Sequence, residues 1–442
     1  MTSPSNVENP GSGQLGLAGR HPRQMWVEVK RKGLGDKSMK WKTLARFGCI
    51  HLLFFAALCS ARAQSPQPAP AAAPAAPAPV LSLEDAVVNA ATALFTNAQL
   101  PPGDEKVDVV IDPLIDGYSG AQSTATHLIE KRIVELVKAK FPRFRILPFT
   151  KEALAKSPIV FVGTLRAINN ATVTKGPRDA YWICLRLADL KSNKIVSRGA
   201  ARAKIDEVDA TPTLTFAESP VWADDAATAA YIKTCQETKV GDPLNPAYVE
   251  RINAATLISD GINEFDNKHY RESLAFYRTA LGAPGGDQLR VHNGLYLANW
   301  KLNRHDDAAD AFGRLVNFSL MTNKLGVRFL FKPGSTRFLD DKAVTGPYSM
   351  WLKQIADRVI ESNLCLEIVG HTSPTGPIQL NERLSALRAQ AIKQLLETDE
   401  PRLAERLIAT GVGPRENLIG TGKDDPSDAL DRRVEFKVLK CG

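Results

Sequence analysis

Apolar and polar positions between residues 81 and 245 alternate between helical and strand spacing. Apolar side chains recur at helical spacing in two segments, and the second begins after Ser123, a residue suited to cap a helix. Runs rich in Val and Ile indicate buried strands. The pattern predicts an α/β domain over 81–245. Its expected elements are a helix at 82–97, a strand at 107–116, a helix at 123–141, strands at 143–149 and 157–168, and a hairpin at 181–203 turning at 191–194.

A second pattern, over 246–322, is helical throughout and repeats itself. Ser273 in the first copy corresponds to Ala308 in the second, a shift of 35 residues. Tetratricopeptide helix pairs repeat every ~34 residues. The segment therefore resembles two tetratricopeptide (TPR) repeats, with imperfect small residues. Its aromatic side chains are expected in the core. Such a pair would serve either as a protein-docking groove or as a structural spacer.

The last part of the chain, over 324–442, changes again to alternating strands and helices. Its helices have one apolar face, and its last strand alternates apolar and polar residues. We expect the order βαβαββ. The elements are a strand at 327–338, a helix at 348–362, a strand at 364–372, a helix at 377–397, and strands at 416–423 and 432–440. The fold class is therefore an α+β multidomain protein.

The first 63 residues have the pattern of a secretory leader. A basic segment precedes the apolar run 47–59, and Ala61-Arg62-Ala63 matches the small-residue cleavage pattern. Met39 is an alternative start. Residues 64–80 are rich in proline and alanine, which is typical of an extended, semi-stiff linker. We expect secretion, with an uncleaved anchor as the alternative.

The net charge of +8 belongs to this leader. Residues 1–63 contain ten basic and three acidic side chains, whereas the remaining residues contain 46 and 45. A nucleic-acid-binding surface would need a basic patch on the folded part, and the sequence does not indicate one. No nucleic-acid partner is expected.

Four cysteines follow the leader, and an oxidising compartment permits them to pair. Four cysteines allow three pairings. The local choice is Cys184 with Cys235 and Cys365 with Cys441, one disulfide in each folded part. The alternative is four unpaired thiols.

Three motifs in the last part have a specific spacing: Gly370-His371-Thr372, then Asn381 with Ser385 and Arg388 on one helix face, then 431–436 (DRRVEF). They resemble the OmpA-like C-terminal domain found in OmpA, MotB and Pal-type proteins, which anchors envelope proteins to peptidoglycan. The α/β domain is weakly similar in pattern to CsgG-like, FlgO-like and TolB amino-terminal domains.

The OmpA-like resemblance implies a site for diaminopimelate, the stem-peptide residue with an ammonium and a carboxylate on one carbon. The implied ligand-binding residues are Thr372, Ser373, Asn381, Arg388 and Arg433. An arginine can grip the carboxylate with two hydrogen bonds.

In the family an aspartate after Gly-His-Thr usually holds the ammonium, but Ser373 occupies that position here. A nearby acid could substitute, the ligand could be a modified stem, or the domain could have lost wall binding. The candidate acids are Asp424, Asp425, Asp428 and Asp431.

These patterns predict a non-enzymatic protein of the periplasm or envelope of a Gram-negative bacterium, peripherally associated with the outer membrane. It would bind peptidoglycan and present its first two parts to an unidentified protein partner through the TPR-like segment. The alternatives are an assembly scaffold that has lost wall binding and, last, an envelope enzyme. No catalytic set, cofactor motif or metal-ligand cluster is discernible in the sequence.

Overall fold

The computed structural model describes residues 78–169, 176–222, 225–323, 325–423 and 426–441. The leader predicted at 1–63, the start at Met39 and the linker up to residue 77 lie outside the described residues. Within the described part of the chain, no helix combines the length and the apolar composition needed to cross a membrane.

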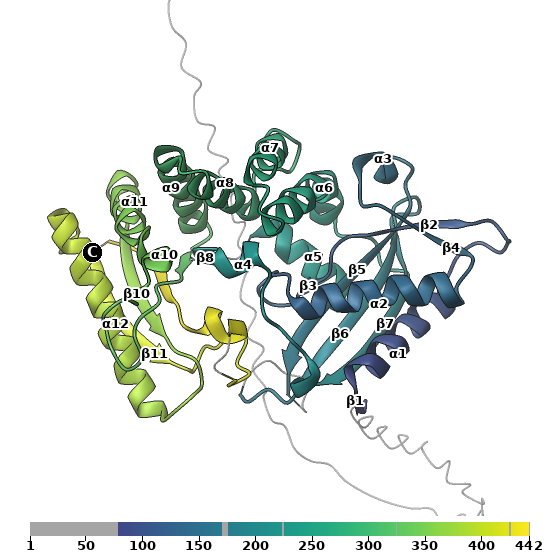
Figure 1. Cartoon of the computed structure of the whole chain (residues 1–442), viewed down its shortest axis with the longest axis horizontal. Helices are drawn as coiled ribbons and strands as arrows, with labels where there is room; N and C mark the ends of the chain where they lie inside the picture. Colours follow the sequence, from purple (N-terminus) through teal and green to yellow (C-terminus); the bar gives the residue numbers. More distant parts are fainter. Residues whose placement is uncertain (1–77, 170–175, 223–224, 324, 424–425, 442) are drawn as a thin grey trace, which may run out of the picture. The chain divides into compact units, whose positions relative to one another are not determined.

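The N-terminal part is built on a seven-stranded sheet with the order β1-β7-β6-β5-β2-β4, and β3 pairs with β5 (Figure 1). Strands β2, β4 and β5 run parallel, whereas β5, β6 and β7 form antiparallel pairs. The elements in chain order are β1 (Val80–Leu81), α1 (Leu83–Thr96), β2 (Val107–Ile111), β3 (Ile115–Asp116), α2 (Thr124–Lys140), β4 (Phe144–Leu147), α3 (Lys151–Leu154), β5 (Ile159–Ile168), β6 (Ala180–Asp189), β7 (Lys194–Lys204), the 3-10 turn η1 (Ile205–Glu207), α4 (Leu214–Glu218), β8 (Val221–Trp222) and α5 (Ala226–Gln236).

Most of the elements predicted for this part are confirmed, with one interruption. The strand expected at 107–116 is two strands separated at residues 112–114, because Pro113 cannot donate to a sheet ladder. Ser123 caps α2 as predicted: its hydroxyl accepts from the Thr126 amide, and the Thr126 hydroxyl in turn accepts from the Ser123 amide.

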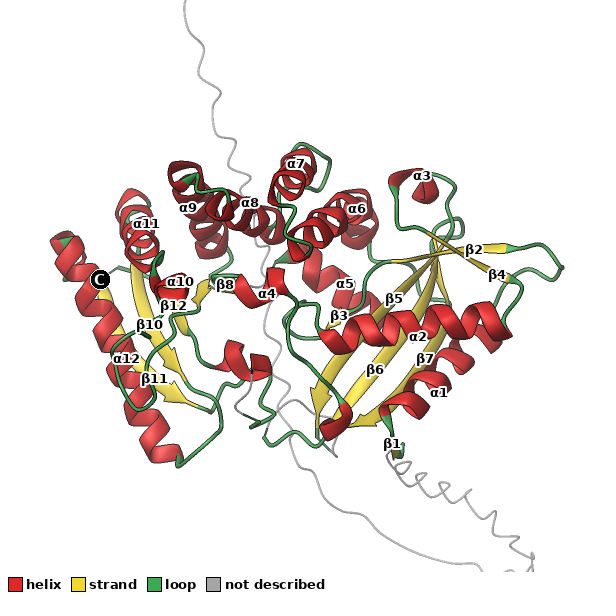
Figure 2. Cartoon of the chain, viewed as in Figure 1, coloured by secondary structure: helices red, strands yellow, loops and turns green. Residues whose placement is uncertain are grey.

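Both faces of this sheet are covered by helices. In Figure 2, α1 and α2 lie across one face, where the apolar side chains of alternate strand positions form a core with them. Apolar side chains at the remaining strand positions form a second core with α5 and α6 on the other face. The two cores are separate because successive strand residues point to opposite faces of the sheet. Thus Val109 joins the first core, and its neighbour Val110 joins the second.

Two helical hairpins follow the N-terminal sheet. Tyr277 is fully buried between the backbones of neighbouring helices, where Gly261 and Gly294 leave room for its ring. A side chain at Gly294 would collide with that ring, so the glycine permits the close approach. The aromatic residue belongs to the core, as expected. The helices are α6 (Pro246–Asp266), α7 (Tyr270–Leu281), α8 (Leu289–Lys301) and α9 (His305–Met321).

The C-terminal part contains a five-stranded sheet in the order β11-β10-β12-β9-β8. Strands β10 and β11 are parallel, and β12 runs antiparallel between β10 and β9. The elements are β9 (Leu325–Val327), α10 (Lys342–Thr345), α11 (Tyr348–Glu361), β10 (Cys365–His371), α12 (Ile378–Asp399), η2 (Pro401–Leu403), β11 (Leu407–Gly413), η3 (Pro426–Asp431) and β12 (Val434–Leu439).

Two strand predictions in this part need correction. The strand expected at 416–423 is a loop, and the strand β11 lies earlier, at 407–413. The loop forms because the amides of residues 418–421 donate to the carboxylates of Asp428 and Asp431 instead of to a neighbouring strand. The strand expected at 327–338 is extended only at its start, and Phe331 forms an isolated bridge with Phe338.

A short segment that precedes the helical hairpins extends the C-terminal sheet. Strand β8 pairs antiparallel with β9, with Val221 opposite Val327 and Trp222 opposite Gly326. One apolar core includes Val221, the inner faces of α6–α9 and helices and strands of the C-terminal part. Within it, the Trp351 indole donates to the Tyr296 hydroxyl at 2.9 Å. The core therefore crosses the boundary that the sequence suggested between the helical segment and residues 324–442.

Candidate functional site

All five predicted site residues line one cavity of about 360 Å³ in the C-terminal part. It lies between the end of β10, the first turns of α12 and the segment 329–339. The size is within the range of small-ligand sites, which starts at ~300 Å³. The residues that the resemblance singled out are Thr372, Ser373, Asn381, Arg388 and Arg433.

The Gly-His-Thr turn is held by the strands on both sides of it. The His371 amide donates to the Arg433 carbonyl on one side, and the Thr372 amide donates to the Gly413 carbonyl on the other. At Gly370 the strand passes directly beneath α12, and a Cβ there would collide with the backbone carbonyl of Ser385. Glycine is therefore required at this position, since the sheet and the helix approach too closely for a side chain.

Asn381 and Ser385 stabilise the site from the helix. The Asn381 side-chain amide donates to the Thr375 carbonyl at 2.9 Å, which closes the loop before α12. The Ser385 hydroxyl accepts from the Gly413 amide at 2.9 Å and donates to the Glu382 carbonyl. Ser385 does not line the cavity, so its role is to join α12 to the end of β11.

Arg388 is a buried cation whose protein partners are all uncharged. Its guanidinium donates to the carbonyls of Ser335 and Lys332, at 3.1 and 3.2 Å, and lies 4.9 Å from the centre of the Phe331 ring. Among the described residues, no carboxylate forms an ion pair with it. Burial, with the neighbouring Arg432 guanidinium, lowers the pKa of Arg388 to about 10, so the side chain remains charged at neutral pH.

Thr372 lines the cavity and has a buried hydroxyl. It is 3% exposed, and its hydroxyl has no hydrogen-bond partner among the described residues. A buried hydroxyl without a partner costs free energy, and a ligand acceptor would recover it. The backbone of Thr372 is fixed, because its carbonyl accepts from the Asn417 side chain at 2.9 Å.

Arg433 lines the cavity but directs most of its donors elsewhere. Its Nε and Nη2 atoms each lie 2.6 Å from Glu435 Oε1, and Nη1 donates to the Leu430 carbonyl. Burial alone would raise the pKa of Glu435, but the nearby His371 and Arg433 bring it down to about 2. Arg433 thus pairs with the carboxylate of Glu435. The adjacent Arg432 also lines the cavity.

His371, Glu416 and Glu435 form a cluster of metal-ligand type within the described residues. His371 Nε2 lies 3.4 Å from Glu435 Oε2 without the alignment of a hydrogen bond, and burial lowers the pKa of the imidazole. Arg433 already provides a cation to Glu435. The cluster is therefore explained by an ion pair, and we assign no metal to it.

The predicted acids beside the site have other roles where the structure describes them. Asp431 accepts from the amides of Leu418, Ile419 and Gly420, and Asp428 accepts from Thr421. Both are fully buried. They stabilise the loop before β12 and do not line the cavity. Asp424 and Asp425 lie outside the described residues.

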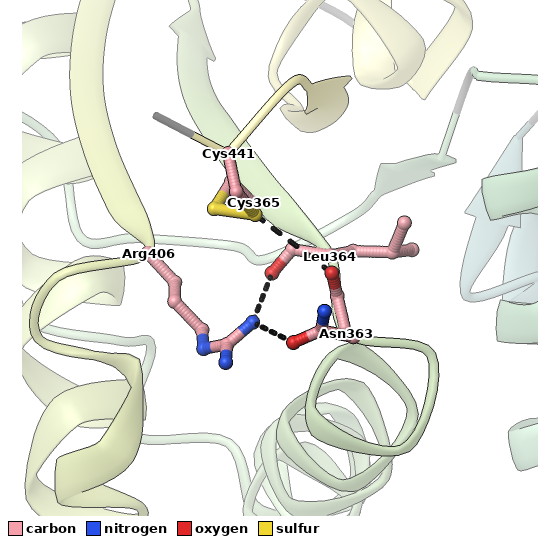
Figure 3. Close-up of a disulfide and its surroundings, with 5 residues drawn as sticks. All are labelled: Asn363, Leu364, Cys365, Arg406 and Cys441. Atoms are coloured by element: carbon pink, nitrogen blue, oxygen red, sulfur yellow. Dashed lines mark hydrogen bonds between the residues drawn. A yellow bond between two sulfur atoms is a disulfide. The ribbon is translucent and has the colours of Figure 1, made fainter.

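One of the two expected disulfides is present. Cys365 at the start of β10 and Cys441 after β12 are joined, with a Cα–Cα distance of 5.2 Å (Figure 3). Beside them, Arg406 donates to the Asn363 side chain at 2.7 Å. Cys184 and Cys235 are not joined in the structure, but their sulfur atoms lie 2.6 Å apart, so the other expected pairing stays a prediction.

Sequence reasoning missed the apolar wall of the cavity. Phe329, Phe331 and Leu339 line it from a segment that has no recognisable motif. The aromatic spacing around a Pro-Gly turn is the one available signal, and the same spacing also predicts a strand.

No protein-family model matches the chain. Part of the chain is similar to outer-membrane proteins. Outer membrane protein Omp38 of Acinetobacter baumannii is 35% identical over 88 residues, which are 20% of this chain and 24% of that protein. Outer membrane porin F of Pseudomonas fluorescens is 33% identical over 104 residues, 23% of this chain and 31% of that protein. The chain thus spans less than a third of the length of either relative.

Solved structures also align with about a quarter of the chain. A MotB-like protein of Desulfovibrio vulgaris is 27% identical, with a TM-score of 0.23, and the match covers 27% of this chain and 73% of that one. The cell wall anchor of the type VI secretion system of Pseudomonas aeruginosa is 26% identical, with a TM-score of 0.22, and the match covers 26% and 80%.

Proposed function

We propose that this is a non-enzymatic envelope protein that binds peptidoglycan non-covalently through the cavity around Arg388. The N-terminal sheet and the helical hairpins would then be presented to a protein partner. The observation that carries the proposal is the buried Arg388, whose protein partners are neutral carbonyls. A buried cation without a counterion is costly, so the site favours an anionic ligand.

The geometry is suited to a stem-peptide carboxylate. Arg388 can form charge-assisted hydrogen bonds, and the Thr372 hydroxyl can donate one more. The apolar wall from Phe329 to Leu339 can pack against an aliphatic side chain such as that of diaminopimelate. The motif resemblance supports peptidoglycan as the source of this carboxylate, and the similarity to Omp38 supports an association with the outer membrane.

The test is co-sedimentation of the full chain with purified sacculi at moderate salt. Loss of a charge-assisted hydrogen bond costs ~1.5–3 kcal/mol, so we expect Arg388→Ala to weaken binding about tenfold or more. Arg383→Ala is the matched control, because Arg383 is exposed on the same helix and does not line the cavity.

A second variant keeps the proposal testable if Arg388→Ala fails to fold. Thr372→Val removes a hydroxyl that has no partner among the residues the structure describes, so it should leave the fold intact and still reduce binding several-fold. Absence of sacculus binding by the unaltered chain would overturn the proposal. It would favour an assembly scaffold that keeps the fold without wall binding.

A further inference from the structure

A second cleft, of about 740 Å³, lies at one end of the N-terminal sheet. It shares no lining residue with the cavity around Arg388. Ile111 and Pro113 line it at the carboxyl end of β2, and residues 146–150 line it at the carboxyl end of β4. Helices α2 and α6 contribute the rest of the lining. The volume lies within the range of ~300–1,000 Å³ that is typical of small-molecule sites.

The connections that leave β2 and β4 go to opposite faces of the sheet. These strands are parallel neighbours. The chain that leaves β2 reaches α2, which packs in the core on one face. The chain that leaves β4 reaches α3, whose Ala153 and Leu154 pack in the core on the other face. In open α/β sheets a ligand crevice forms where the connections diverge in this way, outside the carboxyl ends of the strands. The topology therefore identifies this cleft as a candidate binding site.

The helix that begins beside the cleft does not favour an anionic ligand. A phosphate at such a position is commonly bound by the free amides of a helix N-terminus. Here the amides of residues 124 and 125 already donate to the carbonyls of Thr211 and Asp209. The Thr126 amide donates to the Ser123 hydroxyl. These first amides of α2 are thus committed to the protein itself.

Two carboxylates line the cleft, one from each helix: Glu130 on α2 and Asp260 on α6. Glu130 accepts a long hydrogen bond from the Leu114 amide, at 3.4 Å. Burial raises the pKa of both carboxyls, and the nearby Glu264 and Glu152 raise that of Asp260 further. No basic side chain within the described part of the chain lowers either pKa. A ligand cation would therefore stabilise two carboxylates that are partly desolvated and lack a protein counterion.

The other charged side chains of the cleft are exposed to solvent. Lys131 and Lys138 line it from α2, and neither forms an ion pair with the two carboxylates among the residues that the structure describes. Glu135 is also exposed and pairs with Arg132 at 3.3 Å. Because solvent and salt screen exposed charges, these groups affect a bound cation less than the half-buried carboxylates do.

We propose that this cleft binds an aliphatic amine, with its ammonium on Glu130 or Asp260. Its carbon chain would pack on the apolar strand ends, which include Leu147 and Phe149. A diamine fits best, because the two carboxylates come from different helices and each can hold one ammonium. The proposal gives the N-terminal part a small-molecule ligand and does not depend on wall binding at Arg388.

The test is isothermal titration of the full chain with three probes that share one carbon chain: cadaverine, pentylamine and pentanol. We expect pentylamine to bind about tenfold more weakly than cadaverine and pentanol to bind more weakly still, because each ammonium adds a charge-assisted hydrogen bond. Pentanol binding as tightly as cadaverine would overturn the proposal, as would a lack of cadaverine binding at millimolar concentration.

Carboxylate-to-amide variants locate the bound amine. Glu130→Gln keeps an oxygen that can accept from the Leu114 amide, so the fold should be retained, and cadaverine binding should weaken about tenfold. In Glu130→Gln and in Asp260→Asn, the advantage of cadaverine over pentylamine should largely disappear, since one carboxylate remains in each.

Glu250→Gln is the matched control. Glu250 lies on α6, its side chain is 65% exposed, and it does not line the cleft. This variant should bind cadaverine as the unaltered chain does. An equal loss in Glu250→Gln and Glu130→Gln would indicate general attraction to an acidic surface and overturn the proposal. Melting temperatures without ligand report whether each variant is folded, and the three probes on the unaltered chain decide the matter if Glu130→Gln is not.

Discussion

The two sheets of this protein differ in how many of their faces are buried. In the N-terminal sheet, alternate residues of β6 enter two separate cores: Ile183 and Leu185 face one set of helices, and Cys184 faces the other. In the C-terminal sheet, β12 places Val434 and Phe436 in the core. Glu435, which lies between them, and Lys437, which follows Phe436, point to the opposite face, so only one face of β12 is apolar.

This difference governs where ionisable groups can be accommodated. Asp112 follows β2 at the end of a sheet that is covered on both sides, and burial raises its pKa to about 7 although Tyr248 donates to it at 2.9 Å. Glu435 lies on the polar face of the other sheet, where His371 and Arg433 outweigh its burial and its pKa is about 2. The two pKa values differ because the Arg433 guanidinium lies beside Glu435, whereas burial dominates at Asp112.

The largest effect should come from the apolar face of the C-terminal sheet. Phe436 is fully buried, so Phe436→Ala should lower the free energy of unfolding by about 3–5 kcal/mol through lost contacts and a cavity. Lys437→Ala, one residue later on the polar face, should change it by less than about 0.5 kcal/mol. Urea unfolding measures both. Similar losses for the two variants would contradict the one-sided description of this sheet.

The disulfide provides the next contrast between the sheets. Cys365 and Cys441 close a loop with a sequence separation of 76, so Cys365→Ala with Cys441→Ala should cost about 2–4 kcal/mol. Reducing agent should destabilise the unaltered chain by a similar amount and leave the double variant unchanged, because Cys184 and Cys235 are free thiols. A reductant effect that persists in the double variant would instead indicate a bond between the buried pair in the N-terminal sheet.

The smallest effect is the pH dependence of Asp112. Its folded pKa of about 7 lies above that of an exposed aspartate, so the folded state retains this proton over a range where the unfolded state has lost it. The resulting stabilisation is complete below the unfolded pKa and is lost as the pH rises through about 7. The stability of Asp112→Asn should therefore depend less on pH than that of the unaltered chain between pH ~5 and ~8. Melting temperatures measured across that pH range test this expectation. If they change with pH by the same amount in the two proteins, Asp112 is not buried as described.

The candidate site was predictable because its determinants are local. Thr372 and Ser373 follow a strand directly, and Asn381 and Arg388 share one helix face, so their relative placement depends on regular geometry over a short segment. The apolar wall was not predictable. Phe331 reaches the cavity because its segment folds back under Arg388, which donates to carbonyls 53 and 56 residues away.

The same distinction holds for the fold. The sequence by itself determined the helices and most strands, since apolar periodicity and a cap such as Ser123 act within a few residues. Only the tertiary structure decided that β8 joins a sheet about a hundred residues later. It also decided that Asp428 and Asp431 stabilise the loop before β12. The physical reason is that a buried carboxylate or strand edge bonds to whichever donors the packed core brings near, and those donors are distant in sequence.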